Sequence, residues 1–204
     1  MKNMTRSGWI WFIGITIVAV AINPVLKSIG LLPADVFKSL GIFFPGLPQI
    51  VFGPLLAFLM LLCFVKTGEP LIFPIIGILR ALSLAYLFPK NPEHLGTCLA
   101  GILVGIMAWV IFRNAGRIRL GAWLPLMAAL YAGFYAGGNY LTTLMFGPVD
   151  QTKVILDSWH VTLGIIGGSL AIGLLFGAAA YGLMKLVLKT GPVATARQLR
   201  PRAA

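Results

Sequence analysis

The chain has 204 residues, of which 59% are hydrophobic and only 10% charged, and its mean hydropathy is +0.94. Soluble domains carry about a quarter charged residues, so this composition excludes an ordinary soluble protein and indicates a protein of the lipid bilayer. The net charge is +11. A nucleic-acid partner is not expected, because the sequence lacks the basic face interleaved with aromatic residues that such binders present on a soluble body.

Six apolar runs approach the roughly 20 residues that cross a hydrocarbon core. We therefore predict an all-α fold, a polytopic integral membrane protein that forms a compact bundle of six transmembrane helices. Residues 1–190 form one transmembrane domain, and residues 191–204 form a basic cytoplasmic tail. The predicted helices cover residues 9–30, 48–65, 71–88, 95–112, 120–146 and 158–188.

The basic residues alternate between the connections as six spans require. Short cytoplasmic loops carry an excess of Lys and Arg, so we expect both termini in the cytoplasm of a multi-pass plasma-membrane protein. The opposite connections are near neutral or acidic. The basic positions are Lys2 and Arg6 before the first helix, Arg113, Arg117 and Arg119 after the fourth, and Lys185, Lys189, Arg197, Arg200 and Arg202 at the end.

The first apolar run allows a second interpretation as a cleaved signal peptide. Lys2 and Arg6 would form its charged region, and Ala19–Ala21 would supply small residues at the cleavage site. The apolar run continues to Leu32, and Trp9 occupies the place of an interfacial anchor, which favours an uncleaved span. The two interpretations stay open.

Small residues recur four positions apart on several predicted helices, as at Gly101/Gly105, Gly133/Gly137, Gly164/Gly168 and Gly173/Gly177. Such pairs let helix backbones approach closely in lipid. We expect most of them to pack within the bundle, and a docking face for another subunit is the alternative.

Strongly polar side chains inside a span are costly, so each is a candidate functional residue. Arg80, Asn139 and Asn23 each lie about seven or eight residues from the outer end of their helix, roughly 12 Å deep at about 1.5 Å per residue. We expect them to share one polar layer under the external face. Further candidate binding residues above this layer and at its rim are Tyr140, Trp159, His160, Asp157, Glu93 and His94.

Arg80 has two interpretations. In the first, the guanidinium binds a carboxylate or another anion of a small ligand, with the two asparagines orienting it and Trp159 or Tyr140 stacking on its body. In the second, Arg80 is a structural lock that pairs with Glu93 or Asp157. The common depth of the three polar residues favours a ligand cavity, and both interpretations stay open.

Catalytic signatures are absent from the sequence. The two histidines are isolated and fit no metal-ligand spacing, and no nucleotide-binding glycine loop is present. We therefore expect no catalytic residue, no metal and no cofactor. Energy for uphill transport would have to come from another chain.

The segment Phe43–Gln49, which leads into Gly53–Ala57, is similar to the glycine- and proline-rich start of the second helix in the substrate-binding S components of energy-coupling factor (ECF) transporters. The six spans, the long first external loop and the sizeable loop before the last helix resemble the same family over most of the chain. The AxxxA pattern that these S components carry in their first helix is not matched in this chain, whose first predicted helix contains Ala19, Ala21 and Gly14 instead.

The resemblance implies a non-enzymatic subunit that captures a vitamin or similar micronutrient from outside, in a pocket closed by external loops. It also implies two kinds of partner besides the bilayer, namely a transmembrane coupling subunit and ATPases. The alternative is a non-catalytic structural or accessory subunit of a membrane protein complex. Neither the ligand nor the oligomeric state follows from the sequence.

Overall fold

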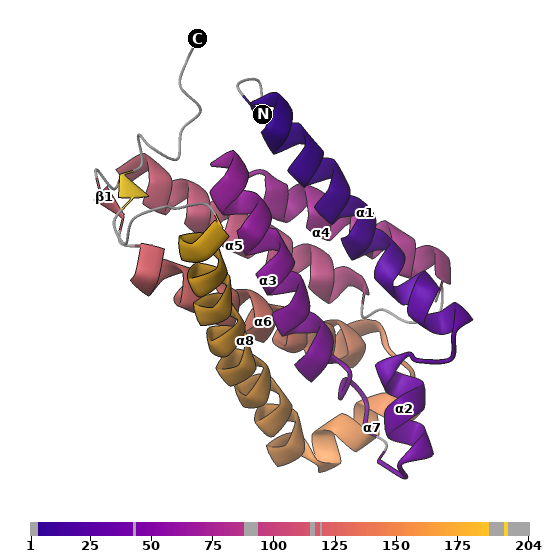
Figure 1. Ribbon diagram of the computed structural model, residues 1–204. Coiled ribbons are helices and arrows are strands. Elements are labelled where there is room, and N and C mark those ends of the chain that lie inside the picture. The colour runs from indigo at the N-terminus through magenta and orange to yellow at the C-terminus, as the bar shows by residue number, and fades with distance from the viewer. Residues whose placement is uncertain are drawn as a thin grey trace.

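The computed structural model describes residues 4–42, 44–87, 94–114, 117–118, 120–187 and 194–195. Within these ranges the chain forms eight helices and one antiparallel pair of two-residue strands (Figure 1). The prediction of an all-α fold is confirmed at this level. The elements are α1 Arg6–Ser28, α2 Pro33–Ser39, α3 Gln49–Thr67, α4 Ile72–Leu87, α5 His94–Asn114, β1 Arg117–Ile118, α6 Leu120–Phe146, α7 Val149–Asp157, α8 Trp159–Val187 and β2 Ala194–Thr195.

Each of the six apolar runs corresponds to one long helix, namely α1, α3, α4, α5, α6 and α8. Three stretches are long and apolar enough to cross a membrane: Arg6–Ser39, which comprises α1 and α2, Gln49–Thr67 and Trp159–Leu183. The helical stretches Ile72–Leu87 and His94–Val110 are apolar but shorter. Membrane insertion of all six helices therefore remains a prediction.

Helix α3 is the enclosed centre of the bundle. It contacts α1, α4, α6 and α8, and most of its residues are buried, among them Phe52, Leu56 and Met60. A helix that is apolar all round must be covered on all sides. The remaining helices complete the bundle through the pairs α1 with α4, α4 with α5, α5 with α6, and α6 with α8.

Glycines stand where helices approach most closely. A Cβ on Gly101 of α5 would lie 2.6 Å from the Phe73 carbonyl oxygen of α4, and a Cβ on Gly177 of α8 would lie 2.5 Å from Pro125 Cα of α6. No side chain fits at either position. These glycines therefore pack within the molecule, whereas Gly164 of α8 has nothing within 4 Å of a built Cβ.

The two sizeable connections expected at residues 31–47 and 147–157 each contain a short helix, α2 and α7. The sequence reasoning missed both because they are too short to form an apolar run. Their starts carry local signals, since Pro33 opens α2 and Asp35 lies in its first turn, while Pro148 caps α7 and Asp150 lies in its first turn. Proline at a helix start and acids near the helix N-terminus favour helix formation.

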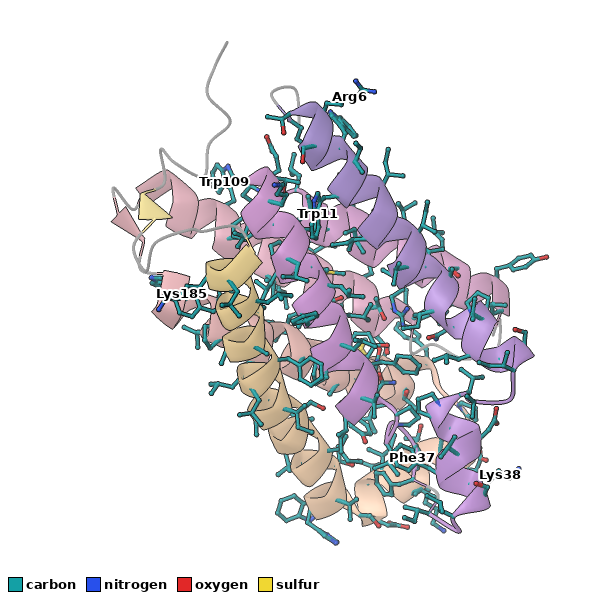
Figure 2. All side chains as sticks on the ribbon, in the orientation of Figure 1. Arg6, Trp11, Phe37, Lys38, Trp109 and Lys185 are labelled. Carbon is teal, nitrogen blue, oxygen red and sulfur yellow. The ribbon has the colours of Figure 1, made fainter. Side chains whose placement is uncertain are left out.

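The short elements gather at opposite ends of the bundle. Helices α2 and α7 lie at one end, whereas the start of α1, the end of α8 and the β1–β2 pair lie at the other (Figure 1). Figure 2 shows Arg6, Trp109 and Lys185 toward the second end and Phe37 and Lys38 at the first. The tail expected at 191–204 thus contributes Ala194 and Thr195 to a strand pair with Ile118 and Arg117.

Candidate functional site

A cavity of about 190 Å³ lies at the α2 end of the bundle, where α1, α3, α4, α5 and α6 surround it and α2 contributes to its wall. Small-molecule sites are concave and mostly apolar, with a few polar groups that fix the ligand's orientation. The cavity matches this description. It is lined by Asn23, Leu32, Ala34, Asp35, Pro48, Gln49, Phe52, Leu84, His94 and Tyr135.

The polar lining groups come from different elements. Asn23 comes from α1, Gln49 from the first turn of α3 and His94 from the first turn of α5, while Asp35 belongs to α2. The rings of Phe52 and Tyr135 supply flat apolar surface. The cavity is therefore suited to a small molecule with an unsaturated or apolar body and several hydrogen-bonding groups.

Arg80 lies behind this wall and is completely buried. Its Nη1 donates to the Ala19 carbonyl oxygen at 2.5 Å, and its Nη2 donates to Asn23 Oδ1 at 3.1 Å. The guanidinium carbon lies 5.4 Å from the centroid of the Phe52 ring, within the range of a cation–π contact. Arg80 thus holds two residues of the cavity wall, and it joins α4 to α1 and α3.

Ser83 adds a second link between α4 and α1. Pro24 has no N–H and cannot bond the Val20 carbonyl four residues earlier in α1. The Ser83 hydroxyl donates to that carbonyl oxygen at 3.2 Å. The Val20 carbonyl oxygen, which Pro24 leaves without its usual partner in α1, therefore accepts a hydrogen bond from α4, one turn from Arg80.

Asn139 does not join Arg80 and Asn23. It is buried on α6 against Gly96 of α5, where its side-chain amide occupies the space that a Cβ on Gly96 would take. The backbone carbonyl oxygen of Asn139 accepts hydrogen bonds from the hydroxyls of Thr142 and Thr143, at 3.0 and 2.8 Å. The predicted common layer is thus divided between an α1–α4 contact and an α5–α6 contact.

Tyr140 fastens the connection that leads into α3. Its hydroxyl donates to the Pro45 carbonyl oxygen at 2.8 Å, and its ring packs against Gly46, where the backbone has φ of 80°. A side chain on residue 46 would be strained in this left-handed conformation and would also meet the ring. Tyr140 therefore holds the loop rather than the cavity wall.

The remaining predicted site residues lie in three places. His94 lines the cavity. Trp159 and His160 are exposed in the first turn of α8, with ring centroids 6.3 Å apart, and Asp157 is exposed at the end of α7. Glu93 lies outside the described residues. Of the residues predicted from sequence, the structure thus brings Asn23 and His94 into the cavity wall.

The sequence reasoning missed Gln49, Phe52, Tyr135 and Asp35 as lining residues. One signal was available for Tyr135, because it lies four residues from both Tyr131 and Asn139 and so shares their helix face. Phe52 and Gln49 carry no comparable signal, since an aromatic residue and an amide at the start of a buried helix have many structural roles.

The described residues contain no group of three or more His, Cys, Asp or Glu side chains placed to hold a metal ion. No protein-family model, curated protein or solved structure matches this chain.

Proposed function

We propose that this chain is a six-span plasma-membrane protein that binds a small, anionic or carboxylate-bearing nutrient, such as a vitamin, for uptake. In this proposal it acts as the substrate-binding S component of an ECF transporter, with a transmembrane coupling subunit and separate ATPases as partners. The observation that carries the proposal is the cavity of about 190 Å³ at the α2 end of the bundle.

The orientation of the cavity is supported by charge. Strand β1 with Arg117, the start of α1 with Arg6 and the end of α8 with Lys185 lie at the end opposite α2 and α7. Since short cytoplasmic loops are enriched in Lys and Arg, that end faces the cytoplasm in the proposal. The cavity then faces outward, as capture of an external nutrient requires.

Multi-pass insertion is supported by the outer surface of the bundle. Large apolar side chains are exposed along α1 and α8, for example Ile13, Ile17 and Leu175. Such continuous apolar surface is rare on soluble monomers and is expected where lipid covers a protein. Helix α6 spans 27 residues without a charged side chain.

The second candidate is a non-catalytic structural or accessory subunit of a membrane complex. One observation favours it: Gly14 on α1 and Gly164 and Gly167 on α8 face open space. Small residues on an outer helix surface would let another transmembrane helix approach closely. This candidate predicts a stable partner chain and no dependence on a small ligand.

The test is a thermal-unfolding screen of the purified protein in detergent against water-soluble vitamins and small carboxylates. A ligand that binds the folded state raises the melting temperature. We expect at least one compound to do so, and we expect Leu84→Trp, which fills the cavity, to abolish the shift. Leu82→Trp is the matched control, because Leu82 is exposed on the same helix.

A second readout separates the two candidates. Two results together support a role as a transporter subunit. ATPase activity copurifies with the tagged protein from its native membrane, and the screen identifies a ligand. If no compound shifts the melting temperature and a stable complex without ATPase activity is isolated, the accessory subunit is the better description.

A further inference from the structure

The Arg80 guanidinium is a buried positive charge that no acidic side chain in the described part of the chain pairs with. Its side chain is 0% exposed, and its hydrogen-bond acceptors, the Ala19 carbonyl and the Asn23 amide, are both neutral. None of the described residues forms an ion pair with it. Its Nε–H has no hydrogen-bond partner among them. Burying a charge in this way is costly unless an opposite charge joins it.

Tyr131 of α6 is a second unpartnered donor nearby. The side chain is 1% exposed, and its hydroxyl has no hydrogen-bond partner within the described part of the chain. Tyr131 belongs to the same buried cluster as Phe52, whose ring lies against the Arg80 guanidinium. An unmade hydrogen bond at a buried hydroxyl is unfavourable, so the pair is suited to a guest that accepts hydrogen bonds.

Both groups lie directly behind the cavity wall. Asn23 and Phe52, which line the cavity, contact the Arg80 guanidinium. Tyr135, also a lining residue, stacks on Tyr131 with ring centroids 6.4 Å apart and an interplanar angle of 21°. Movement of these three side chains would connect the cavity with the two donors.

We propose that the Arg80 Nε–H and the Tyr131 O–H form an anion subsite behind the cavity wall, which receives the acid group of the ligand as a carboxylate. This inference rests on the proposed function and adds Tyr131 as a specificity-determining residue. A guanidinium N–H and a hydroxyl both donate to carboxylate oxygens, and hydrogen bonds to a charged acceptor are the stronger kind. The subsite also neutralises the buried charge of Arg80.

The test uses two isosteric probe pairs, acetate with acetamide and benzoate with benzamide, in thermal unfolding of the full chain in detergent. We expect each carboxylate to raise the melting temperature and each amide to have little effect. Sodium chloride at the same sodium concentration is the third arm. A larger rise in melting temperature with the carboxylates than with chloride supports a carboxylate subsite. An equal rise with chloride overturns that assignment and indicates a site for a monatomic anion.

Matched variants test the two donors. Tyr131→Phe should weaken carboxylate binding roughly tenfold or more, the loss of one hydrogen bond to a charged group. Tyr86→Phe should not, because Tyr86 is 88% exposed on α4. Arg80→Gln should abolish carboxylate preference, with Arg6→Gln as its exposed control. Tyr131→Phe keeps the test decisive if Arg80→Gln does not fold.

Two results would overturn the subsite. Equal effects of carboxylate and amide would mean that the site does not recognise a negative charge, and unchanged carboxylate binding by Tyr131→Phe would remove that residue from the subsite. A vitamin that binds wild type and Tyr131→Phe equally, yet fails to bind Leu84→Trp, would refute the subsite and leave the proposed function intact.

Discussion

Arg80 illustrates how one residue organises the ligand end of the bundle. Through neutral partners it connects α4 with Asn23 of α1 and Phe52 of α3. The structural lock expected with Asp157 is not found, since Asp157 is exposed and forms no ion pair with Arg80. The lock expected with Glu93 falls outside the described residues. Arg80 is thus a link between helices and, in our proposal, a donor to the ligand.

The Ser83 bond to the Val20 carbonyl predicts a context-dependent effect on stability. Ser83→Ala should destabilise the protein by about 1 kcal/mol or more, because a half-buried carbonyl loses its partner. In a Pro24→Ala background the effect should be smaller, since alanine at that position supplies the missing backbone N–H. The measurement is the melting temperature in detergent of the two single variants and the double variant.

Ser39→Ala is the control for this pair. Ser39 is exposed and bonds only the Val36 carbonyl of its own helix, so its loss should change the melting temperature little. Equal destabilisation by Ser83→Ala in both backgrounds would show that Ser83 does not compensate for Pro24.

At the scale of the elements, the helices are held together by close backbone approach at glycines. Gly101 meets the Phe73 carbonyl, Gly138 meets Gly96, and Gly177 meets Pro125. In a membrane, van der Waals packing of this kind replaces much of the hydrophobic driving force between helices. Small residues are therefore a condition for the α4–α5, α5–α6 and α6–α8 contacts.

Two glycine-to-alanine substitutions should have opposite effects. Gly101→Ala should destabilise the protein by roughly 1 to 3 kcal/mol, because its Cβ would overlap the backbone of α4. Gly167→Ala should be neutral or stabilise by up to about 1 kcal/mol, since open space surrounds it and alanine favours the helix. Thermal unfolding in detergent measures both, and destabilisation by Gly167→Ala alone would contradict this packing.

At the scale of the whole molecule, the six long helices in the described part of the chain return it to the end from which it started. The start of α1, the end of α8 and the β1–β2 pair share one end, and α2 and α7 share the other (Figure 1). Arg6, Lys185 and strand β1 with Arg117 belong to the first end. Charge and helix arrangement therefore favour the same orientation.

Accessibility of single cysteines tests this orientation. In a variant with Cys63→Ala and Cys98→Ala, we expect Lys153→Cys on α7 to react with an impermeant thiol reagent in intact cells. Arg117→Cys in β1 should be protected until the membrane is permeabilised, because basic loops stay in the cytoplasm. Labelling of both positions from outside would refute the six-span topology.

The sequence by itself determined the helices and their approximate ends. Backbone groups in lipid must bond within their own segment, so an apolar run of sufficient length has few structures available other than a helix. The sequence also predicts that Arg80, Asn23 and Asn139 lie inside helices, and they do so in α4, α1 and α6. The short helices α2 and α7 did not follow, because their signals are single prolines and acids rather than a repeating pattern.

Only the tertiary structure decided which polar residues meet. Residues at equal depth can face different neighbours, since the rotation of each helix about its axis depends on packing against the others. Packing turned Asn23 toward Arg80 and Asn139 toward Gly96 of α5. It also brought Tyr135 into the cavity wall and left Trp159 exposed. The physical reason is that Tyr135 lies on α6, which packs against α3, α5 and α8, whereas Trp159 is the first residue of α8.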